Sequence, residues 1–164
     1  MKLKIIAIAS LLAVYISVSA QEKDSNKISY SNITEWGHIN LSVVNNFGFA
    51  LEVTTVHGIS IDKKHHIGLG TGIGFDFASI GGYSPLFLNY RICFIPNRTF
   101  SPHLNVSFGG LFVQDYFADY AMGIYSSVTS GFVAGKFSFS SGLSFFAANH
   151  EFMTGVVIKC GFIF

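Results

Sequence analysis

The strongest constraint in the sequence is the alternation of apolar residues along its last fourteen positions, EFMTGVVIKCGFIF. Residues of one parity form an almost continuous apolar row: Phe152, Val156, Ile158, Cys160, Phe162 and Phe164. The other parity carries Gly155, Lys159 and Gly161 among larger apolar residues. Because successive side chains of a strand point to opposite faces, residues 151–164 are predicted to form a strand with one apolar face and one mixed, charged face.

The first twenty residues have the pattern of a secretory signal peptide. Lys2 and Lys4 precede an apolar run over residues 5–16, and the small residues of Val18-Ser19-Ala20 form a cleavage site. A membrane anchor is the alternative, but the apolar run is shorter than the ~20 residues of a spanning helix. We therefore expect residues 1–20 to be removed on export and the polar residues 21–36 to form a flexible segment ahead of the fold.

Composition narrows the choice of fold class. Only 12% of the residues are charged, whereas soluble domains have about 25%. The net charge of +1 argues against nucleic acid as a partner, because a nucleic-acid-binding protein needs a basic face. No segment after residue 20 has the ~18 continuous apolar residues of a membrane helix. An exported chain of this kind is either a soluble all-β domain or a membrane β-barrel.

Period-2 alternation separated by turn residues marks eight strands. Their predicted positions are residues 37–44, 47–61, 66–77, 85–95, 101–113, 123–134, a segment starting at 137, and 151–164. Most of these segments are long enough to cross a bilayer as tilted strands, which takes about 9–11 residues. Since lipid offers no hydrogen bonds to the backbone, such strands must close into a barrel. The prediction is an all-β fold, an eight-stranded antiparallel up-and-down transmembrane β-barrel over residues 37–164, in which the last strand pairs with residues 37–44.

The alternation alone fits two kinds of barrel, which differ in whether the apolar face points inward or outward. A soluble ligand-carrying barrel such as a lipocalin points its apolar face inward, whereas a membrane barrel points it outward. The less apolar face is mostly Gly, Ser, Asn and Thr, with about one charge on some strands, and small residues suit the crowded lumen of a narrow barrel. This favours the membrane barrel, with Ile39, Leu41 and Val43 of the first strand facing lipid and His38 facing the lumen.

Three stretches carry a resemblance to a known family. The glycine-alternating segment GLGTGIGFDF, the segment PLFLNYRICF and the C-terminal phenylalanine resemble the small outer-membrane β-barrel family of OmpA/OmpX-like eight-stranded proteins, over residues 37–164. The resemblance implies Sec-dependent export to the outer membrane of a Gram-negative bacterium. The signal peptide predicts that both chain ends lie in the periplasm. The resemblance also implies that the barrel-assembly machinery recognises the closing strand, with Phe162 and Phe164 as the assembly signal. Outer-membrane lipid is the other expected partner, and the surface partner is left open.

Four charged residues are predicted to point into the lumen near the middle of their strands: Glu52, Asp76, Arg91 and Lys159. Buried ions are costly unless they are paired, so we expect a lumen charge network. The favoured bridges join Glu52 to Lys159 or to Arg91. Such a network either plugs a closed barrel, which we favour, or lines a path for ions or small solutes.

Histidines offer a possible metal site. His38, His66 and His103 are all predicted to face the lumen near the periplasmic end. Alternate strands lie roughly 10 Å apart along a sheet, which is too far for ready convergence on one ion. No metal and no cofactor are therefore expected.

An enzyme that deacylates or acylates outer-membrane lipid is the main alternative function. That chemistry uses a serine and a histidine with a carboxylate near the barrel rim. Ser126, Ser127, His150 and Glu151 are the candidate residues, but no recognisable motif surrounds them. The preferred prediction is a barrel with a closed polar lumen, a structural or surface-interaction role and no catalysis.

Overall fold

A computed structural model describes residues 28–43, 46–77, 81–96, 99–114, 120–148 and 151–164. The predicted signal peptide, residues 1–20, lies outside the described residues. The strands are β1 (Ile28–Val43), β2 (Asn46–Ile61), β3 (His65–Asp76), β4 (Gly81–Cys93), β5 (Phe100–Gln114), β6 (Tyr120–Ala134), β7 (Phe137–Ala148) and β8 (Glu151–Ile163). In this part of the chain no helix is both long and apolar enough to cross a membrane.

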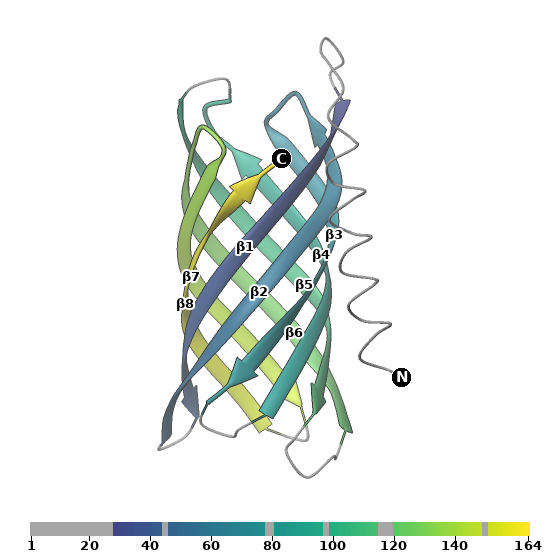
Figure 1. The fold of residues 1–164 in the computed structure, drawn as a ribbon, viewed down its shortest axis with the longest axis vertical. Coiled ribbons are helices and arrows are strands. Elements are labelled where there is room, and N and C mark those ends of the chain that lie inside the picture. Colours follow the sequence, from purple (N-terminus) through teal and green to yellow (C-terminus); the bar gives the residue numbers. More distant parts are fainter. Residues whose placement is uncertain (1–27, 44–45, 78–80, 97–98, 115–119, 149–150) are drawn as a thin grey trace.

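The eight strands form one closed barrel in which each strand pairs with its sequence neighbour (Figure 1). Every pair is antiparallel, including β1 with β8, whose register runs from Ile33↔Ile163 to Ser42↔Thr154. Two further backbone hydrogen bonds extend this seam, from Phe164 N to Asn32 O at 2.8 Å and from Asn32 N to Phe164 O at 3.1 Å. The predicted eight-stranded antiparallel up-and-down barrel is confirmed.

The first strand differs from the prediction in its start. It begins at Ile28, so residues 28–36, predicted to be flexible, form more than half of β1. The strand also runs with the opposite face inward over the described side chains. Ile39 is fully buried in the lumen, whereas His38 lies outside with its ring centroid 5.8 Å from that of Phe49. The side chains of Leu41 and Val43 are outside the described part.

The reason for the reversed face lies further upstream. Trp36 is half exposed on the outer surface, where its ring centroid is 5.8 Å from that of Phe162. Glu35 is therefore inside, where it is buried among polar groups of other strands. Once residues 35 and 36 are placed, alternation puts Ile39 inside and His38 outside.

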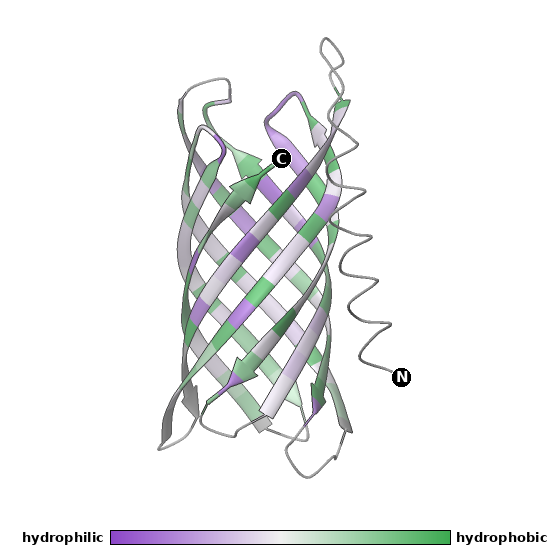
Figure 2. Cartoon of the chain, in the orientation of Figure 1, coloured by the Kyte–Doolittle hydropathy of each residue, from purple (hydrophilic) through white to green (hydrophobic). Residues whose placement is uncertain are grey.

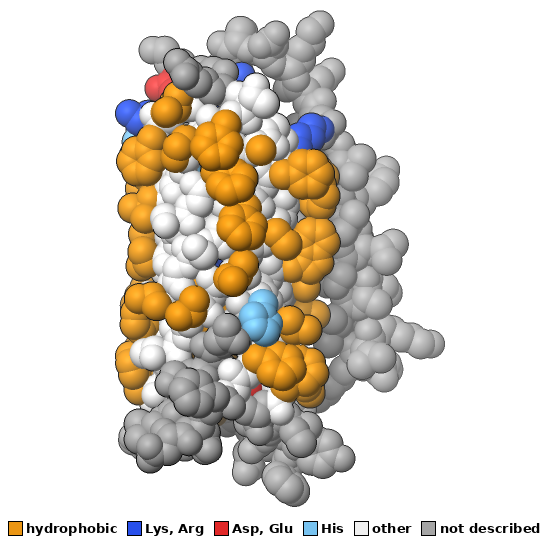
Figure 3. Space-filling view, turned by 90° about the vertical axis from the view of Figure 1, so that its left-hand side faces the viewer, with side chains coloured by type: hydrophobic (Ala, Val, Ile, Leu, Met, Phe, Trp, Pro, Cys, Tyr) orange, Lys and Arg blue, Asp and Glu red, His pale blue; other side chains and the backbone are white. Residues whose placement is uncertain are grey.

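The other seven strands have the predicted faces. Large apolar side chains cover the outside, with Leu69, Ile73 and Leu88 all more than 60% exposed. Hydrophilic and hydrophobic positions alternate along the strands (Figure 2), and apolar side chains extend over much of the visible barrel wall (Figure 3). An outward apolar surface of this extent would be unstable in water, and it is the surface that a bilayer covers.

Glycines on the inner face of β3 make room for aromatic side chains of β4. A Cβ atom at Gly70 would overlap the Phe87 ring, and one at Gly74 would overlap the Tyr83 ring. The glycine-alternating segment therefore lets two rings occupy the space directly over β3, inside a narrow lumen enclosed by eight strands.

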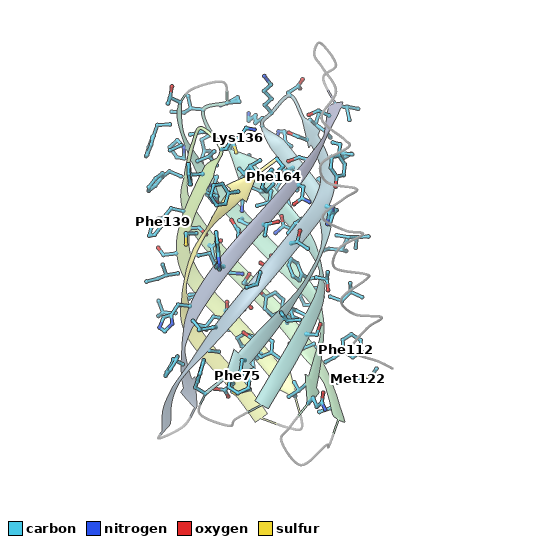
Figure 4. All side chains as sticks on the ribbon, viewed as in Figure 1. Phe75, Phe112, Met122, Lys136, Phe139 and Phe164 are labelled. Atoms are coloured by element: carbon cyan, nitrogen blue, oxygen red, sulfur yellow. The ribbon has the colours of Figure 1, made fainter. Side chains whose placement is uncertain are left out.

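Aromatic side chains also mark both ends of the barrel. Figure 4 shows Phe164 toward one end, near Lys136, and Phe75 and Phe112 toward the other. Such a distribution is typical of the aromatic girdles of membrane barrels.

Candidate functional site

The lumen is the candidate site, and its first part is an ion pair between β1 and β4. Arg91 Nη2 donates to Glu35 Oε1 at 2.6 Å, and the two side chains are 2% and 6% exposed. Ser138 of β7 completes the group, because its hydroxyl donates to Glu35 Oε1 at 2.8 Å and accepts from Arg91 Nη1 at 3.2 Å. Three strands that are not neighbours are thereby linked across the lumen.

A second ion pair joins β2 and β8. Lys159 Nζ lies 2.5 Å from Glu52 Oε1, and both side chains are buried. Tyr125 Oη accepts from Lys159 Nζ at 3.2 Å and donates to Glu52 Oε1 at 3.3 Å, while Tyr83 Oη donates to Glu52 Oε2 at 3.3 Å. The Glu52 carboxylate therefore has an ammonium and two phenols as partners.

Between these groups lies a ladder of neutral polar side chains on β4, β5 and β6. Asn89 Nδ2 donates to Asn105 Oδ1 at 2.8 Å and to Ser107 Oγ at 2.9 Å. Asn105 Nδ2 in turn donates to Thr129 Oγ1 at 3.4 Å. All four side chains are buried, so the ladder ties three consecutive strands together on the lumen side.

The end of the lumen away from the β2–β3 turn is apolar. We call this cluster the apolar layer: Ile39, Ala50, Phe87, Leu111, Tyr125, Phe146 and Val157. The rings contact one another, with centroid distances of 5.2 Å for Phe87–Tyr125 and 5.5 Å for both Tyr125–Phe146 and Tyr83–Phe146. The predicted polar lumen is thus correct only in part, because the apolar layer fills one end and Ile33 and Val56 are buried apolar residues of the other half.

The predicted charge network can now be compared with the geometry. The structure brings Glu52 and Lys159 together, but it pairs Arg91 with Glu35. Asp76 is half-buried at the far end of β3, away from the β2–β3 turn, and takes part in neither of these two ion pairs. Glu35 was missed because it lay in the segment predicted to be flexible. The alternation of Ile33, Glu35, Gly37 and Ile39 upstream and downstream of Trp36 is the signal that could have found it.

The candidate metal ligands do not converge. His66 and His103 are buried in the lumen as predicted, but His38 is on the outer surface, which contradicts its predicted inward orientation. Among the described residues, no group of three or more His, Cys, Asp or Glu side chains could hold a metal ion.

Of the residues considered for lipid-modifying chemistry, the structure describes the side chains of the two serines, and they lie on opposite faces of β6. Ser127 is fully buried in the lumen, whereas Ser126, its neighbour in β6, has the opposite, outward orientation. His150 and the side chain of Glu151 are outside the described residues.

The two residues of the expected assembly signal sit on the outer face of the closing seam. Phe162 packs between Trp36 of β1 and Phe137 of β7, at centroid distances of 5.8 Å and 4.6 Å. Phe164 is half exposed, and its backbone extends the pairing with β1.

A closed antiparallel barrel with an apolar outer wall and a filled lumen defines a class, the small membrane β-barrels. Neisserial surface protein A (NspA) has a similar structure, with a TM-score of 0.55 and 10% identity over 84% of this chain and 99% of NspA. The N-terminal β-barrel domain of Pseudomonas aeruginosa OprF has a TM-score of 0.50 and 11% identity over 80% of this chain and 97% of that one.

The attachment invasion locus protein Ail of Yersinia pestis has a TM-score of 0.49 and 6% identity, covering 85% of this chain and 100% of Ail. No protein-family model matches the sequence, and no curated protein matches it. At these identities the similarity shows the fold alone. That fold is the one found in the small OmpA/OmpX-like outer-membrane barrels.

Proposed function

We propose that this chain is an integral outer-membrane β-barrel that does not conduct ions and has a structural or surface-interaction role without catalysis. The fold it shares with NspA and the OprF barrel domain supports the location in the bacterial outer membrane. The apolar outer wall supports integration into lipid, because lipid-facing strands carry apolar side chains on alternate positions.

The filled lumen is the observation that supports the proposal that the barrel does not conduct ions. Arg91 of β4 reaches across the interior to Glu35 of β1, and Lys159 of β8 meets Glu52 of β2 over Gly37 of the strand between them, so neither charge faces an open path. The apolar layer then covers the Glu52–Lys159 pair with the rings of Tyr125, Phe87 and Phe146. An ion would have to displace both an ion pair and a packed aromatic cluster, and each displacement costs several kcal/mol.

The test is single-channel recording in planar bilayers after the barrel has been refolded in detergent. Heat-dependent gel mobility establishes that the inserted protein is folded, because a folded barrel migrates differently before and after boiling. The folded wild type should give no steady conductance steps at neutral pH. Steady steps from a protein that shows the mobility shift would contradict the proposal, as would a wild type found in a soluble periplasmic fraction.

A matched variant tests whether the lumen ion pair is part of a permanent plug or acts as a gate. Glu52→Gln keeps the shape of the side chain but removes the charge that pairs with Lys159. If the lumen is a packed plug, the apolar layer keeps Glu52→Gln as silent as the wild type. Conductance that appears in Glu52→Gln would show that the ion pair is a gate.

We propose that the barrel-assembly machinery contacts the closing strand, β8. Phe162 and Phe164 end a strand whose aromatic side chains lie on the outer surface, where a partner can reach them before the seam closes. Outer-membrane lipid is the permanent partner proposed for the apolar wall. The assembly role is tested by the deletion described in the Discussion.

A further inference from the structure

We infer that the outward face at the β2–β3 turn binds the headgroup of an anionic phospholipid in the periplasmic leaflet. We call this surface the interfacial patch: Tyr30, His57, Lys63, Lys64, His65 and Tyr90. The inference rests on the proposed function, which places the barrel in the outer membrane, and on the expected periplasmic position of the chain ends. The β2–β3 turn lies at the same end of the barrel as the C-terminus (Figure 1), so it is on the periplasmic side.

The turn itself is tight and presents two ammonium groups. Asp62 and Lys63 have φ values of 53° and 54°, and Lys64 N donates to Ile61 O at 3.0 Å. Two consecutive residues in the left-handed region define a tight type I′ hairpin turn. Lys63 and Lys64 are both exposed, and the exposed carboxylate of Asp62 offsets one of the two charges.

Two tyrosine–histidine pairs flank the turn on the outer surface. Tyr30 Oη of β1 lies 2.6 Å from His57 Nδ1 of β2, and Tyr90 Oη of β4 lies 2.7 Å from His65 Nδ1 of β3. In both pairs the rings are close, with centroid distances of 6.3 Å and 6.1 Å. Each hydrogen bond fixes a phenol at the edge of the apolar wall, the position that amphipathic rings take at headgroup level.

Charge complementarity identifies the ligand as an anion. In the described part of the chain the exposed lysines are Lys63, Lys64 and Lys136, and all three lie in turns at this end of the barrel. Asp62 is the one exposed carboxylate among the described side chains. Figure 3 shows lysine and arginine side chains at the upper end of the barrel, beyond much of the apolar wall. A phosphodiester beside Lys63 and Lys64 would meet two ammonium groups, with phenols below it at the level of the glycerol esters.

The geometry favours this turn over the β6–β7 turn. Lys136 follows Gly135, whose φ is 63°, and brings a single ammonium group with phenylalanines at nearby outward positions, among them Phe137 and Phe132. Those rings offer no hydrogen-bonding group to a headgroup. Lys136 is therefore the matched control, since it lies at the same end of the barrel in a similar tight turn.

The experiment is native mass spectrometry of the refolded full chain, released from vesicles of phosphatidylglycerol mixed equally with phosphatidylethanolamine. We expect one phosphatidylglycerol molecule to stay bound to the wild type. Each lysine near an anionic lipid surface contributes about fivefold, so the double variant Lys63→Gln/Lys64→Gln should weaken retention roughly 30-fold. Lys136→Gln should change retention of that molecule less than twofold.

The other outcomes overturn the inference. Equal retention of the two lipids would show that charge does not select the ligand, and an equal loss in Lys136→Gln would show a diffuse basic rim without a site. Preferential binding of lipid A phosphates, offered in a parallel sample, would place this turn in the outer leaflet. Heat-dependent gel mobility of each variant distinguishes a lost lipid site from a barrel that did not fold. A wild type without the mobility shift would instead count against the proposed function.

Discussion

Replacing Glu35 tests whether the lumen ion pairs hold the barrel together. Glu35→Leu leaves the Arg91 guanidinium in a site where its side chain is 2% exposed and where Ser138 is its other hydrogen-bond partner within the described residues. Removing one partner of a buried pair costs about 3–5 kcal/mol, because the remaining charge is uncompensated. We expect the lower end of that range, ~3 kcal/mol, since the Ser138 hydroxyl still solvates the cation; this corresponds to a change of more than 100-fold in the unfolding equilibrium.

The assay is urea unfolding of the barrel refolded into lipid vesicles, followed by tryptophan fluorescence. Trp36 is the single tryptophan of the sequence, and it is half exposed on the outer surface, so it reports on insertion. Asp62→Asn is the control, because Asp62 is exposed in a tight turn where asparagine is also favoured. Its effect should stay within ~0.5 kcal/mol, the usual range for surface substitutions.

A double-mutant cycle separates the pair from its surroundings. Arg91→Met alone should be destabilising by an amount similar to Glu35→Leu, because it leaves the carboxylate buried. The double variant should be more stable than either single variant, since a well-packed apolar pair can replace a buried ion pair at little cost. A cost below ~1 kcal/mol for Glu35→Leu, typical of exposed pairs, would refute the reasoning, as would a double variant whose cost is the sum of the two.

Two further predictions concern the glycines and the closing strand. Gly70→Ala should destabilise the barrel by about 1–3 kcal/mol in the same urea assay, because the added Cβ would overlap an aromatic ring. Gly110→Ala is the control and should be nearly neutral, because a Cβ there would have nothing within 4 Å. Equal costs for the two substitutions would contradict the packing argument. Deletion of Phe164 should reduce the heat-modifiable fraction in outer membranes several-fold while Phe164→Tyr leaves it unchanged, and full assembly of the deletion variant would rule out the proposed signal.

Most of the fold was predictable because lipid imposes a simple rule on seven of the eight strands. On β3 and β4 the outward positions are occupied by residues such as Leu69, Ile73 and Leu88, while most inward positions are small or polar, with Phe87 as a large apolar exception. The sequence of each such strand is enough to predict which of its faces points outward, and the number and order of the strands follow from the turns between them. No knowledge of side-chain packing is needed for that step.

The face of β1 could not be predicted by the same rule, because its outward residues are largely polar. Tyr30 and Thr34 face outward beside Thr55 and His57 of β2, and Asn32, which is buried, belongs to the same polar group. These side chains bond to one another: Asn32 Nδ2 lies 3.3 Å from His57 Nδ1, and Thr55 Oγ1 donates to Asn32 Oδ1 at 3.3 Å. Polar groups that satisfy one another can lie against lipid at moderate cost, so apolarity was a misleading guide on this strand.

The pairing of the lumen charges depends on geometry that alternation does not contain. Alternation placed Arg91 and Lys159 inside, but their partners come from strands far away in the sequence, and the choice of partner is set by the tilt and stagger of the closed barrel. Arg91 and Glu35 are separated by 56 residues. Sequence periodicity predicts whether a side chain points into the lumen or outward. It does not predict the height along the barrel axis at which that side chain lies.

The seam between β1 and β8 shows how closure and charge pairing support each other. Gly37 lies opposite Lys159 on one side and Glu52 on the other, and a Cβ there would come within 3.0 Å of Glu52 Cγ and 3.4 Å of Lys159 Cγ. Gly161 lies opposite Glu35, whose Cγ would be 2.7 Å from a Cβ at that glycine. A shift of the seam by two residues would keep every face but move both glycines away from the side chains they accommodate. Because the Glu52–Lys159 pair spans this seam and Glu35 fits against Gly161, the lumen charges help to specify where the barrel closes, whereas the apolar outer rows specify only that it closes.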